Sequence, residues 1–327
     1  MKIAVLDDYQ DVVRRLDCFS MLKDHEVKVF THTARGAGQL AVRLADFEAL
    51  VLIRERTALS RALLLRLPNL RLVSQTGKVS GHIDLVTAAE RGITIVEGAG
   101  DPIAPAELTW ALIMAATRKL PHYAGNLRDG LWQTASMSWE KNTLGRKLKS
   151  RTLAIWGYGR IGRLVAGYGK AFGMDVMVWG RPASLAAAQQ DGLRAAASRE
   201  AFFAEADVLS LHLRLNDDTR GIVTADDLAR MKPDALFVNT SRAELVAPDA
   251  LQVALEAGRP GFAALDVFES EPLLPTSPLL RMENVLATPH LGYVEQDSYE
   301  LYFRSAFQNI LDYAAGTPRN VLALPQA

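Results

Sequence analysis

Short runs of aliphatic residues alternate with longer amphipathic stretches along the whole chain. In the first hundred residues this pattern predicts five strands, near residues 2–6, 26–30, 49–53, 70–74 and 94–96. Helical patterns lie between them. One of these, Asp84–Glu90, is followed by Arg91-Gly92, where glycine suits a helix C-terminus. Such alternation is typical of βαβ units built around a parallel sheet.

A second series of the same kind follows an interruption. The Gly/Pro-rich stretch 98–105 predicts a hinge or domain boundary, a helix is expected over Ala106–Lys119, and residues 125–150 are expected to be irregular. Beyond them the pattern predicts a last helix over about 295–315 and six strands, near residues 152–156, 175–179, 207–211, 235–239, 262–267 and 285–288. Six such strands predict a doubly wound parallel sheet.

A glycine motif stands at the start of the second series. It reads Gly157-Tyr158-Gly159-Arg160-Ile161-Gly162, fits G-x-G-x-x-G, and lies between an apolar strand and a helical stretch. In that setting Gly157 would permit a tight turn, Gly159 would let the backbone approach a pyrophosphate, and Gly162 would allow close helix–strand packing. The helix N-terminus would offer N–H groups to the phosphates. The alternative is a purely structural turn, but the context favours dinucleotide binding.

The last three predicted strands are followed by Arg242, by a carboxylate at Glu269 or Glu271, and by His290, and ligands of parallel sheets bind at the carboxyl ends of strands. Singly, each residue could be an ordinary surface or turn residue. Together they supply what hydride transfer at a carbonyl requires. Arginine offers a fork that matches a carboxylate, and histidine can pass a proton near neutral pH. A carboxylate beside the histidine would favour its charged form and fix its tautomer.

Composition narrows the classes of function. The 327 residues suffice for two domains, and 37 Lys+Arg balance 37 Asp+Glu, so nothing indicates nucleic acid or an anionic membrane as partner. Cys18 is the one cysteine, which fits a reducing, cytoplasmic location, and a buried apolar role is expected for it rather than a nucleophilic one. No signal peptide and no apolar run near the ~20 residues of a membrane span are expected.

Five segments of the chain, taken together, resemble the D-isomer-specific 2-hydroxyacid dehydrogenases, particularly the phosphoglycerate dehydrogenase-like branch. The matching segments are 157–162, 211–213 with 219–221, 239–242, 264–272 and 288–292, in family-like order. The resemblance implies an α/β fold of two doubly wound parallel-sheet domains. A Rossmann cofactor domain, 101–296, would be inserted into a flavodoxin-like substrate domain made of 1–100 and 297–327. The active site would lie in the cleft between them.

The resemblance also implies roles for single residues. Arg242 would bind the carboxylate of a 2-oxo acid, His290 would be the acid/base, and Glu271 would orient and charge it. Beside the glycine loop, the expected cofactor contacts are Gly180, Arg181, His212, Thr219, Asn239, Thr240, Ser241, Asp266 and Gly292, with Asp266 near the nicotinamide. The expected substrate contacts are Arg54, Gly77, Lys78 and Arg242, and no metal site is expected.

The leading prediction is an oxidoreductase that interconverts a small D-2-hydroxy acid and a 2-oxo acid with NAD or NADP. D-3-phosphoglycerate dehydrogenase is the specific alternative, because Arg54 could receive a phosphate or a carboxylate and Lys78 could add charge. The other interpretation is that both are ordinary exposed basic residues. A chain of this length predicts no C-terminal regulatory domain. The substrate-side loop 75–84 departs from the family pattern at Val79 and His82. A non-catalytic dinucleotide-sensing scaffold is the alternative from another class.

Cofactor choice is expected to depend on the turn after 175–179. The dinucleotide fingerprint places an acid there for the ribose 2′-OH, but this chain has Gly180-Arg181-Pro182. Without that acid nothing repels a 2′-phosphate, and Arg181 could pair with it. NADP(H) is therefore expected to be accepted and favoured over NAD(H), unless Arg181 points to solvent.

A homodimer is expected from the family resemblance, from the apolar helix expected over Ala106–Lys119, and from the following segment, which carries Trp132 and Trp139. The alternative is that these two tryptophans fill their own domain or line the cleft.

Overall fold

The computed structural model describes residues 1–34 and 36–325, and the chain divides into two compact units. Unit 1 consists of Met1–Asp101 and Glu295–Ala327, and unit 2 of Pro102–Val294. Unit 2 is thus an insertion in the chain of unit 1. No helix in the described part of the chain is both long and apolar enough to cross a membrane.

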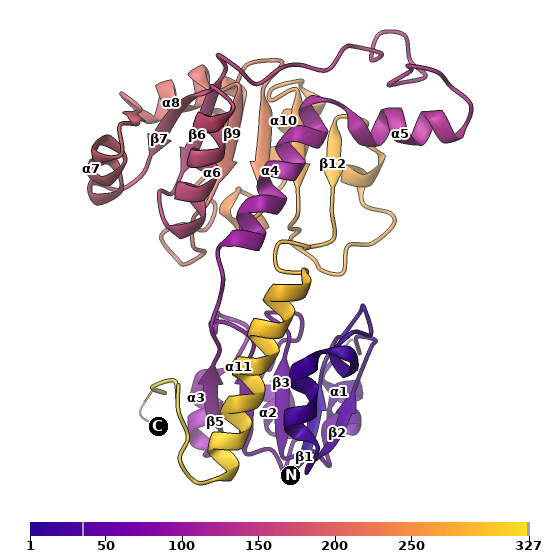
Figure 1. Ribbon diagram of the computed structural model, residues 1–327, viewed down its shortest axis with the longest axis vertical. Helices are drawn as coiled ribbons and strands as arrows, with labels where there is room; N and C mark the ends of the chain where they lie inside the picture. Colours follow the sequence, from indigo (N-terminus) through magenta and orange to yellow (C-terminus); the bar gives the residue numbers. More distant parts are fainter. Residues whose placement is uncertain (35, 326–327) are drawn as a thin grey trace. The chain divides into compact units, whose positions relative to one another are not determined.

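Unit 1 is built on a parallel five-stranded sheet in the order β2-β1-β3-β4-β5 (Figure 1). The strands are β1 (Lys2–Val5), β2 (Glu26–Val29), β3 (Ala49–Leu52), β4 (Leu72–Gln75) and β5 (Thr94–Glu97). β3 and β4 are central and wholly buried, which is why they read as continuous apolar runs, whereas the edge strand β2 alternates exposed Glu26 and Lys28 with half-buried valines.

The helices of unit 1 are α1 (Ala37–Leu44), α2 (Arg61–Leu64), α3 (Leu85–Glu90) and α11 (Gln296–Ala314), with 3₁₀ turns at Val13–Arg15 and Asp17–Leu22. α11 buries one face, which carries Tyr299, Phe303, Phe307 and Ile310 at helical spacing. Its contacts include β4, β5 and the Asp17–Leu22 turn.

Unit 2 is built on a parallel seven-stranded sheet in the order β12-β11-β10-β9-β6-β7-β8. The strands are β6 (Thr152–Trp156), β7 (Asp175–Trp179), β8 (Arg194–Ala195), β9 (Val208–Leu211), β10 (Leu236–Asn239), β11 (Phe262–Leu265) and β12 (Val285–Ala287). Its helices are α4 (Ile103–Thr117), α5 (Leu120–Arg128), α6 (Arg160–Ala171), α7 (Pro182–Gln190), α8 (Arg199–Glu205), α9 (Ala225–Arg230) and α10 (Ala250–Glu256), with 3₁₀ turns at Ala243–Leu245 and Pro278–Arg281.

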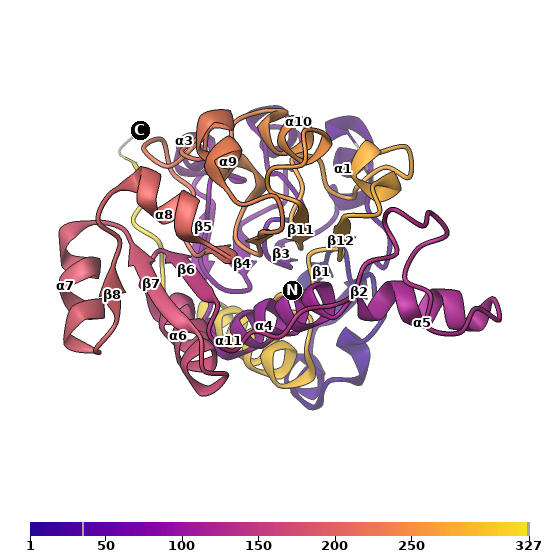
Figure 2. The ribbon, with the colours of Figure 1, turned by 90° about the horizontal axis from the view of Figure 1, so that it is seen from above.

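Helices cover both faces of this sheet (Figure 2). Leu153 and Ile155 of β6 pack with residues of α4, α6 and α7, while Ala154 and Trp156 pack with residues of α8, α9 and α10. Successive residues of a strand face opposite ways, so one short apolar strand serves two cores. The two all-parallel sheets with covering helices confirm the predicted fold class.

Three elements differ from the sequence-based expectation. α4 begins at Ile103, inside the Gly/Pro-rich stretch, because Pro105 lies in its first turn, where no helical N–H bond is lost. α4 ends at Thr117, since Lys119 adopts a left-handed φ of 53° and starts α5 instead of extending α4. α5 therefore occupies part of the stretch expected to be irregular. β8 has two residues, too few to leave a periodic signal.

Candidate functional site

The glycine loop joins β6 to α6 at the carboxyl edge of the unit 2 sheet (Figure 1). Gly157 has a φ of +103°, and a Cβ there would lie 2.5 Å from the carbonyl oxygen of His212. A Cβ on Gly162 would lie 2.1 Å from the carbonyl oxygen of Gly157. By contrast, a Cβ on Gly159 would meet no atom within 4 Å. The fold therefore requires glycine at positions 157 and 162, whereas Gly159 faces open space.

α6 begins immediately after Gly159, its N-cap, with Arg160, Ile161 and Gly162 in its first turn. The N–H groups of a first helical turn have no partner within the helix, and the helix dipole places positive charge there. The open space at Gly159 and these amides form a cradle that fits a pyrophosphate.

His212 follows β9, and its backbone packs against Gly157 of the glycine loop. Its N–H donates to the carbonyl oxygen of Trp156 over 2.8 Å, and its Nε2 lies 2.9 Å from Ser210 Oγ. Burial lowers the pKa of His212 to about 4. His212 is therefore neutral at physiological pH and suits a positioning role better than proton transfer. Thr219 closes the following turn, where its hydroxyl donates to the carbonyl oxygen of Arg214 over 2.7 Å.

The residues after β10 form a tightly bonded turn. Asn239 Nδ2 donates to the carbonyl oxygen of Arg242 over 2.8 Å, and Asn239 Oδ1 accepts from Ser241 N at 3.0 Å. The hydroxyls of Thr240 and Thr109 of α4 lie 2.7 Å apart. The turn thereby fixes the backbone from which the Arg242 guanidinium extends, at the same sheet edge as the glycine loop.

Asp266 follows β11 and organises the segment after β12. Its Oδ1 accepts from Thr288 Oγ1 at 2.7 Å and from Leu291 N at 2.7 Å, and its Oδ2 accepts from Gly292 N at 2.9 Å. Burial raises the pKa of Asp266, while these hydrogen bonds act in the opposite direction. The carboxylate thus holds both ends of the turn that presents His290.

Glu271 and His290 meet although 19 residues separate them in sequence. His290 Nδ1 lies 2.7 Å from Glu271 Oε2, and the other carboxylate oxygen accepts from Phe268 N at 2.9 Å. The ring of Tyr293 packs edge-on against the imidazole, with the ring centres 5.7 Å apart. With Glu271 ionised, Nδ1 carries the proton of this contact, and Nε2 is the nitrogen that can exchange a proton with a ligand.

Gly180 and Arg181 lie at the carboxyl end of β7. Arg181 is exposed and is the N-cap of α7. No carboxylate stands between β7 and Pro182. An exposed arginine at this turn can pair with a ligand phosphate, and it can equally point to solvent.

The expected substrate contacts of unit 1 lie at the carboxyl end of its sheet. Arg54 follows β3 with a φ of 52°, and its guanidinium packs on the backbone of Gly77, where a Cβ would lie 2.0 Å from Arg54 Nη1. Gly77 therefore lets Arg54 lie across the loop that follows β4. Tyr302 of α11 lies beneath the same guanidinium, with 5.9 Å from Cζ to the ring centre.

Lys78 is held by Glu97 at the end of β5. Its Nζ lies 2.8 Å from Glu97 Oε2, and Glu97 Oε1 accepts from Val79 N at 2.7 Å. Glu97 thus balances the charge of Lys78 and anchors the loop after β4. His82 of the same loop lies 3.2 Å from the side-chain oxygen of Gln75 through its Nε2, which is consistent with a role within the loop.

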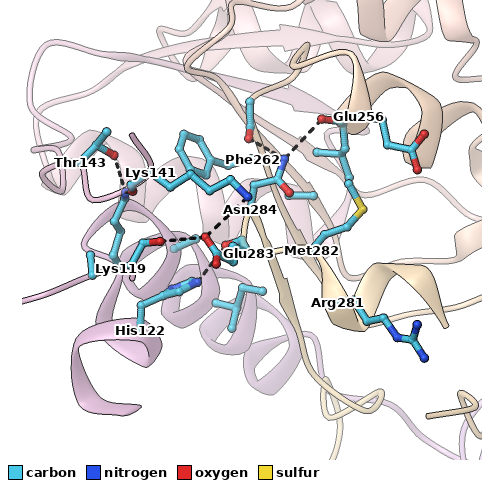
Figure 3. Close-up of a pocket in the computed structure, with 17 residues that line it drawn as sticks. Lys119, His122, Lys141, Thr143, Glu256, Phe262, Arg281, Met282, Glu283 and Asn284 are labelled. Atoms are coloured by element: carbon cyan, nitrogen blue, oxygen red, sulfur yellow. Dashed lines mark hydrogen bonds and ion pairs between the residues drawn. The ribbon is translucent and has the colours of Figure 1, made fainter. Parts of the chain in front are cut away.

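A cavity of about 520 Å³ opens at the amino ends of β11 and β12 (Figure 3). Several of its polar groups are bonded to one another. Lys119 Nζ donates to Thr143 Oγ1, and His122 Nε2 lies 2.8 Å from the carbonyl oxygen of Glu283. The glycine loop and His290 follow the carboxyl ends of strands, so this cavity belongs to the opposite sheet edge and is not part of the candidate site.

Sequence reasoning did not foresee three supporting residues. Thr288 binds the Asp266 carboxylate, Tyr293 packs on His290, and Glu97 pairs with Lys78. Thr288 lies inside segment 288–292, which carries the family resemblance, so a sequence signal for this residue existed. Tyr293 and Glu97 act through packing and pairing that the sequence pattern alone does not encode.

A parallel sheet whose carboxyl edge carries a dinucleotide-type glycine loop, an arginine and a histidine–carboxylate pair has the site architecture of nicotinamide-dependent dehydrogenases. Residues 110–292 match the family model described as "D-isomer specific 2-hydroxyacid dehydrogenase, NAD binding domain". The chain belongs to this family.

Individual relatives agree with this result. A crystal structure titled putative D-3-phosphoglycerate dehydrogenase oxidoreductase from Ralstonia solanacearum is 59% identical, with a TM-score of 0.96 and 98% of this chain and 96% of that chain covered. The glyoxylate reductase of Aeropyrum pernix is 37% identical over 80% of this chain and 78% of that protein. The D-3-phosphoglycerate dehydrogenase of Archaeoglobus fulgidus is 29% identical over 99% of this chain, which spans only 60% of that protein.

Proposed function

We propose that the protein is an NAD(P)(H)-dependent oxidoreductase that interconverts a small D-2-hydroxy acid and the corresponding 2-oxo acid. The observation that carries this proposal is the 2.7 Å contact between Glu271 and His290 at the sheet edge of the glycine loop. A non-catalytic dinucleotide-sensing scaffold would not require this pair. A panel of 2-oxo acids assayed by the absorbance of the reduced nicotinamide tests the proposal.

The cofactor would be held by the glycine loop and by the turns after the neighbouring strands. The amides of Arg160, Ile161 and Gly162 would bind the pyrophosphate across Gly159. The remaining proposed contacts follow the other strands: Gly180, Arg181, His212, Thr219, Asn239, Thr240, Ser241, Asp266 and Gly292. The bound nicotinamide supplies the hydride in the reductive direction and accepts it in the oxidative one.

The residues of the chain supply binding and the proton. The Arg242 guanidinium would bind the carboxylate of the oxo acid through two parallel hydrogen bonds and so fix the carbonyl. His290 Nε2 would donate its proton to the carbonyl oxygen as the carbon is reduced, and would take it back during oxidation. Glu271 would stabilise the charged imidazole and keep Nε2 directed at the substrate.

We further propose that NADP(H) is accepted and favoured over NAD(H). Exposed Arg181 and the absence of an acid in the turn after β7 support this. Arg181→Ala should lower kcat/KM for NADPH about tenfold, which is ~1.4 kcal/mol, and leave that for NADH nearly unchanged. A wild-type preference for NADH beyond tenfold would contradict the proposal.

On the substrate side we propose unit 1 as the substrate domain, with contacts from Arg54, Gly77 and Lys78. D-3-phosphoglycerate dehydrogenase activity remains the specific alternative, because two relatives carry that description. A phosphate would bind Arg54 and Lys78, but Glu97 already neutralises the charge of Lys78. A small 2-oxo acid without a phosphate is therefore the favoured substrate, and a comparison of hydroxypyruvate with its 3-phosphate ester tests this choice.

We propose that the protein is a cytoplasmic homodimer. The stretch 120–144 exposes six large apolar side chains by 53–85%, namely those of Leu120, Leu127, Trp132, Met137, Trp139 and Leu144. Exposure of this kind is typical of association surfaces and does not fit tryptophans that fill their own domain. Sedimentation of the wild type and of Trp132→Ser/Trp139→Ser at micromolar concentration tests the dimer, and a wild-type species of only 35.8 kDa would contradict it.

A further inference from the structure

Tyr158, between the first two glycines of the loop, faces the protein interior. It is 7% exposed and belongs to the core that α6 and α7 build on the sheet. Its hydroxyl donates to Asp191 Oδ2 over 2.7 Å. Asp191 directly follows α7 and is its C-cap. One side chain of the glycine loop is therefore bonded to the residue that ends α7.

Asp191 is bound from two further directions. Arg163 of α6 lies 3.4 Å from the same Oδ2 through its Nη1 and stacks over the Tyr158 ring, with its Cζ 4.9 Å from the ring centre. Lys170, two helical turns further along α6, donates to the Asp191 carbonyl oxygen over 3.2 Å. The carboxylate thus connects the loop, α6 and the end of α7 in one cluster.

A glycine-rich loop needs such support. Gly157 and Gly159 lose more backbone freedom on ordering than other residues would, and a loop that is ordered only by its ligand weakens binding by that amount. Burial and the neighbouring Asp191 raise the pKa of Tyr158 to about 12, so the hydroxyl keeps its proton and donates throughout the physiological range.

We propose that Tyr158 and Asp191 form a positioning pair that orders the glycine loop for the pyrophosphate before the cofactor binds. The inference rests on the proposed cofactor site and adds to it a residue pair that touches no ligand. Arg181 is the N-cap of α7, so the pair connects the loop to the helix beside the proposed 2′-phosphate contact. Tyr158 is thereby a determinant of cofactor affinity and not a catalytic residue.

The test is a double-mutant cycle on the full chain, read as the dissociation constants of NADH and NADPH by fluorescence titration. Tyr158→Phe removes only the hydroxyl, and Asp191→Ala removes the acceptor at a half-exposed site. Each should weaken both cofactors about threefold to tenfold, as expected for one charge-assisted hydrogen bond. The double variant should be no weaker than either single one, because the two groups act as a unit.

Asp191→Asn keeps an acceptor oxygen and should restore most of the affinity. Tyr168→Phe is the matched control, since Tyr168 lies on α6 and packs on Trp110 at 6.0 Å between ring centres. It should leave both dissociation constants unchanged.

Wild-type affinity in Tyr158→Phe and Asp191→Ala would overturn the inference, and so would losses that multiply in the double variant. A lower melting temperature with unchanged dissociation constants would show a role in stability alone and would also overturn it. Failure of the wild type to bind either cofactor would instead overturn the cofactor site itself. The two failures are therefore distinguishable.

Discussion

Gly159→Ala separates the requirements of the fold from those of the cofactor. The residue has φ −94° and ψ −157°, an extended conformation that alanine adopts readily, and its Cβ would meet no atom within 4 Å. The substitution should therefore leave stability unchanged or raise it by about 0.4–1 kcal/mol, because alanine has less freedom to lose on folding.

Binding should respond in the opposite direction. The new methyl group would occupy the open space that the proposed pyrophosphate crosses, and would hold the phosphates away from the amides of the first turn of α6. We expect at least a tenfold rise in the dissociation constants of NADH and NADPH, equivalent to ~1.4 kcal/mol or more.

Gly162→Ala is the matched contrast. Its Cβ would lie 2.1 Å from the carbonyl oxygen of Gly157, so the backbone must shift, and both stability and binding should fall. Thermal unfolding and fluorescence titration of the two variants make the comparison. If Gly159→Ala binds the cofactors like the wild type, the pyrophosphate does not cross Gly159. If it unfolds, the space at Gly159 is not open.

Three further predictions follow from the site. In Glu271→Gln the kcat of oxo-acid reduction should fall, since the carboxylate that lies 2.7 Å from His290 Nδ1 and orients the imidazole is lost; an unchanged kcat would separate Glu271 from the proton transfer. Arg242→Lys should raise KM for the oxo acid nearly as much as Arg242→Ala, because an ammonium cannot form the two parallel bonds, and a fully active lysine variant would contradict this. The folded-state pKa of His212, about 4, lies below its ordinary 6.5, so this residue favours unfolding as pH falls from about 6.5 towards 4, by roughly 3 kcal/mol at most. Urea titrations at pH 7 and pH 5 should show that the free energy of unfolding falls less between these two pH values in His212→Asn than in the wild type. An equal fall in both proteins would refute the lowered pKa of His212.

The fold was predictable because its central strands are buried on both faces. Strands such as β6 and β7 appear in the sequence at their observed bounds, since their buried central residues form continuous apolar runs, as expected of parallel strands covered on both faces. Local features set by single backbone conformations were not predictable. The left-handed Lys119 that separates α4 from α5 is not a glycine, so no residue type marks the break.

The site shows the same division. That Glu271 and His290 follow successive strands was evident from the sequence, but the pairing of these strands and the 2.7 Å contact between the two side chains come from the structure. The pairing of Lys78 with Glu97 joins the ends of β4 and β5 and reduces the charge that Lys78 offers to a ligand. Spacing along the chain predicts which strand end carries a residue, and packing decides its partner.

The central claim is that His290 transfers a proton during nicotinamide-dependent reduction of a 2-oxo acid. The most direct measurement is single-turnover oxidation of bound NADPH or NADH by a panel of 2-oxo acids, in the wild type and in His290→Ala. We predict wild-type turnover with at least one oxo acid, a loss of about 10²-fold or more in His290→Ala, and nearly equal cofactor dissociation constants in the two proteins. Normal turnover in His290→Ala, or no turnover of any 2-oxo acid by a wild type that binds the cofactor, would contradict the claim.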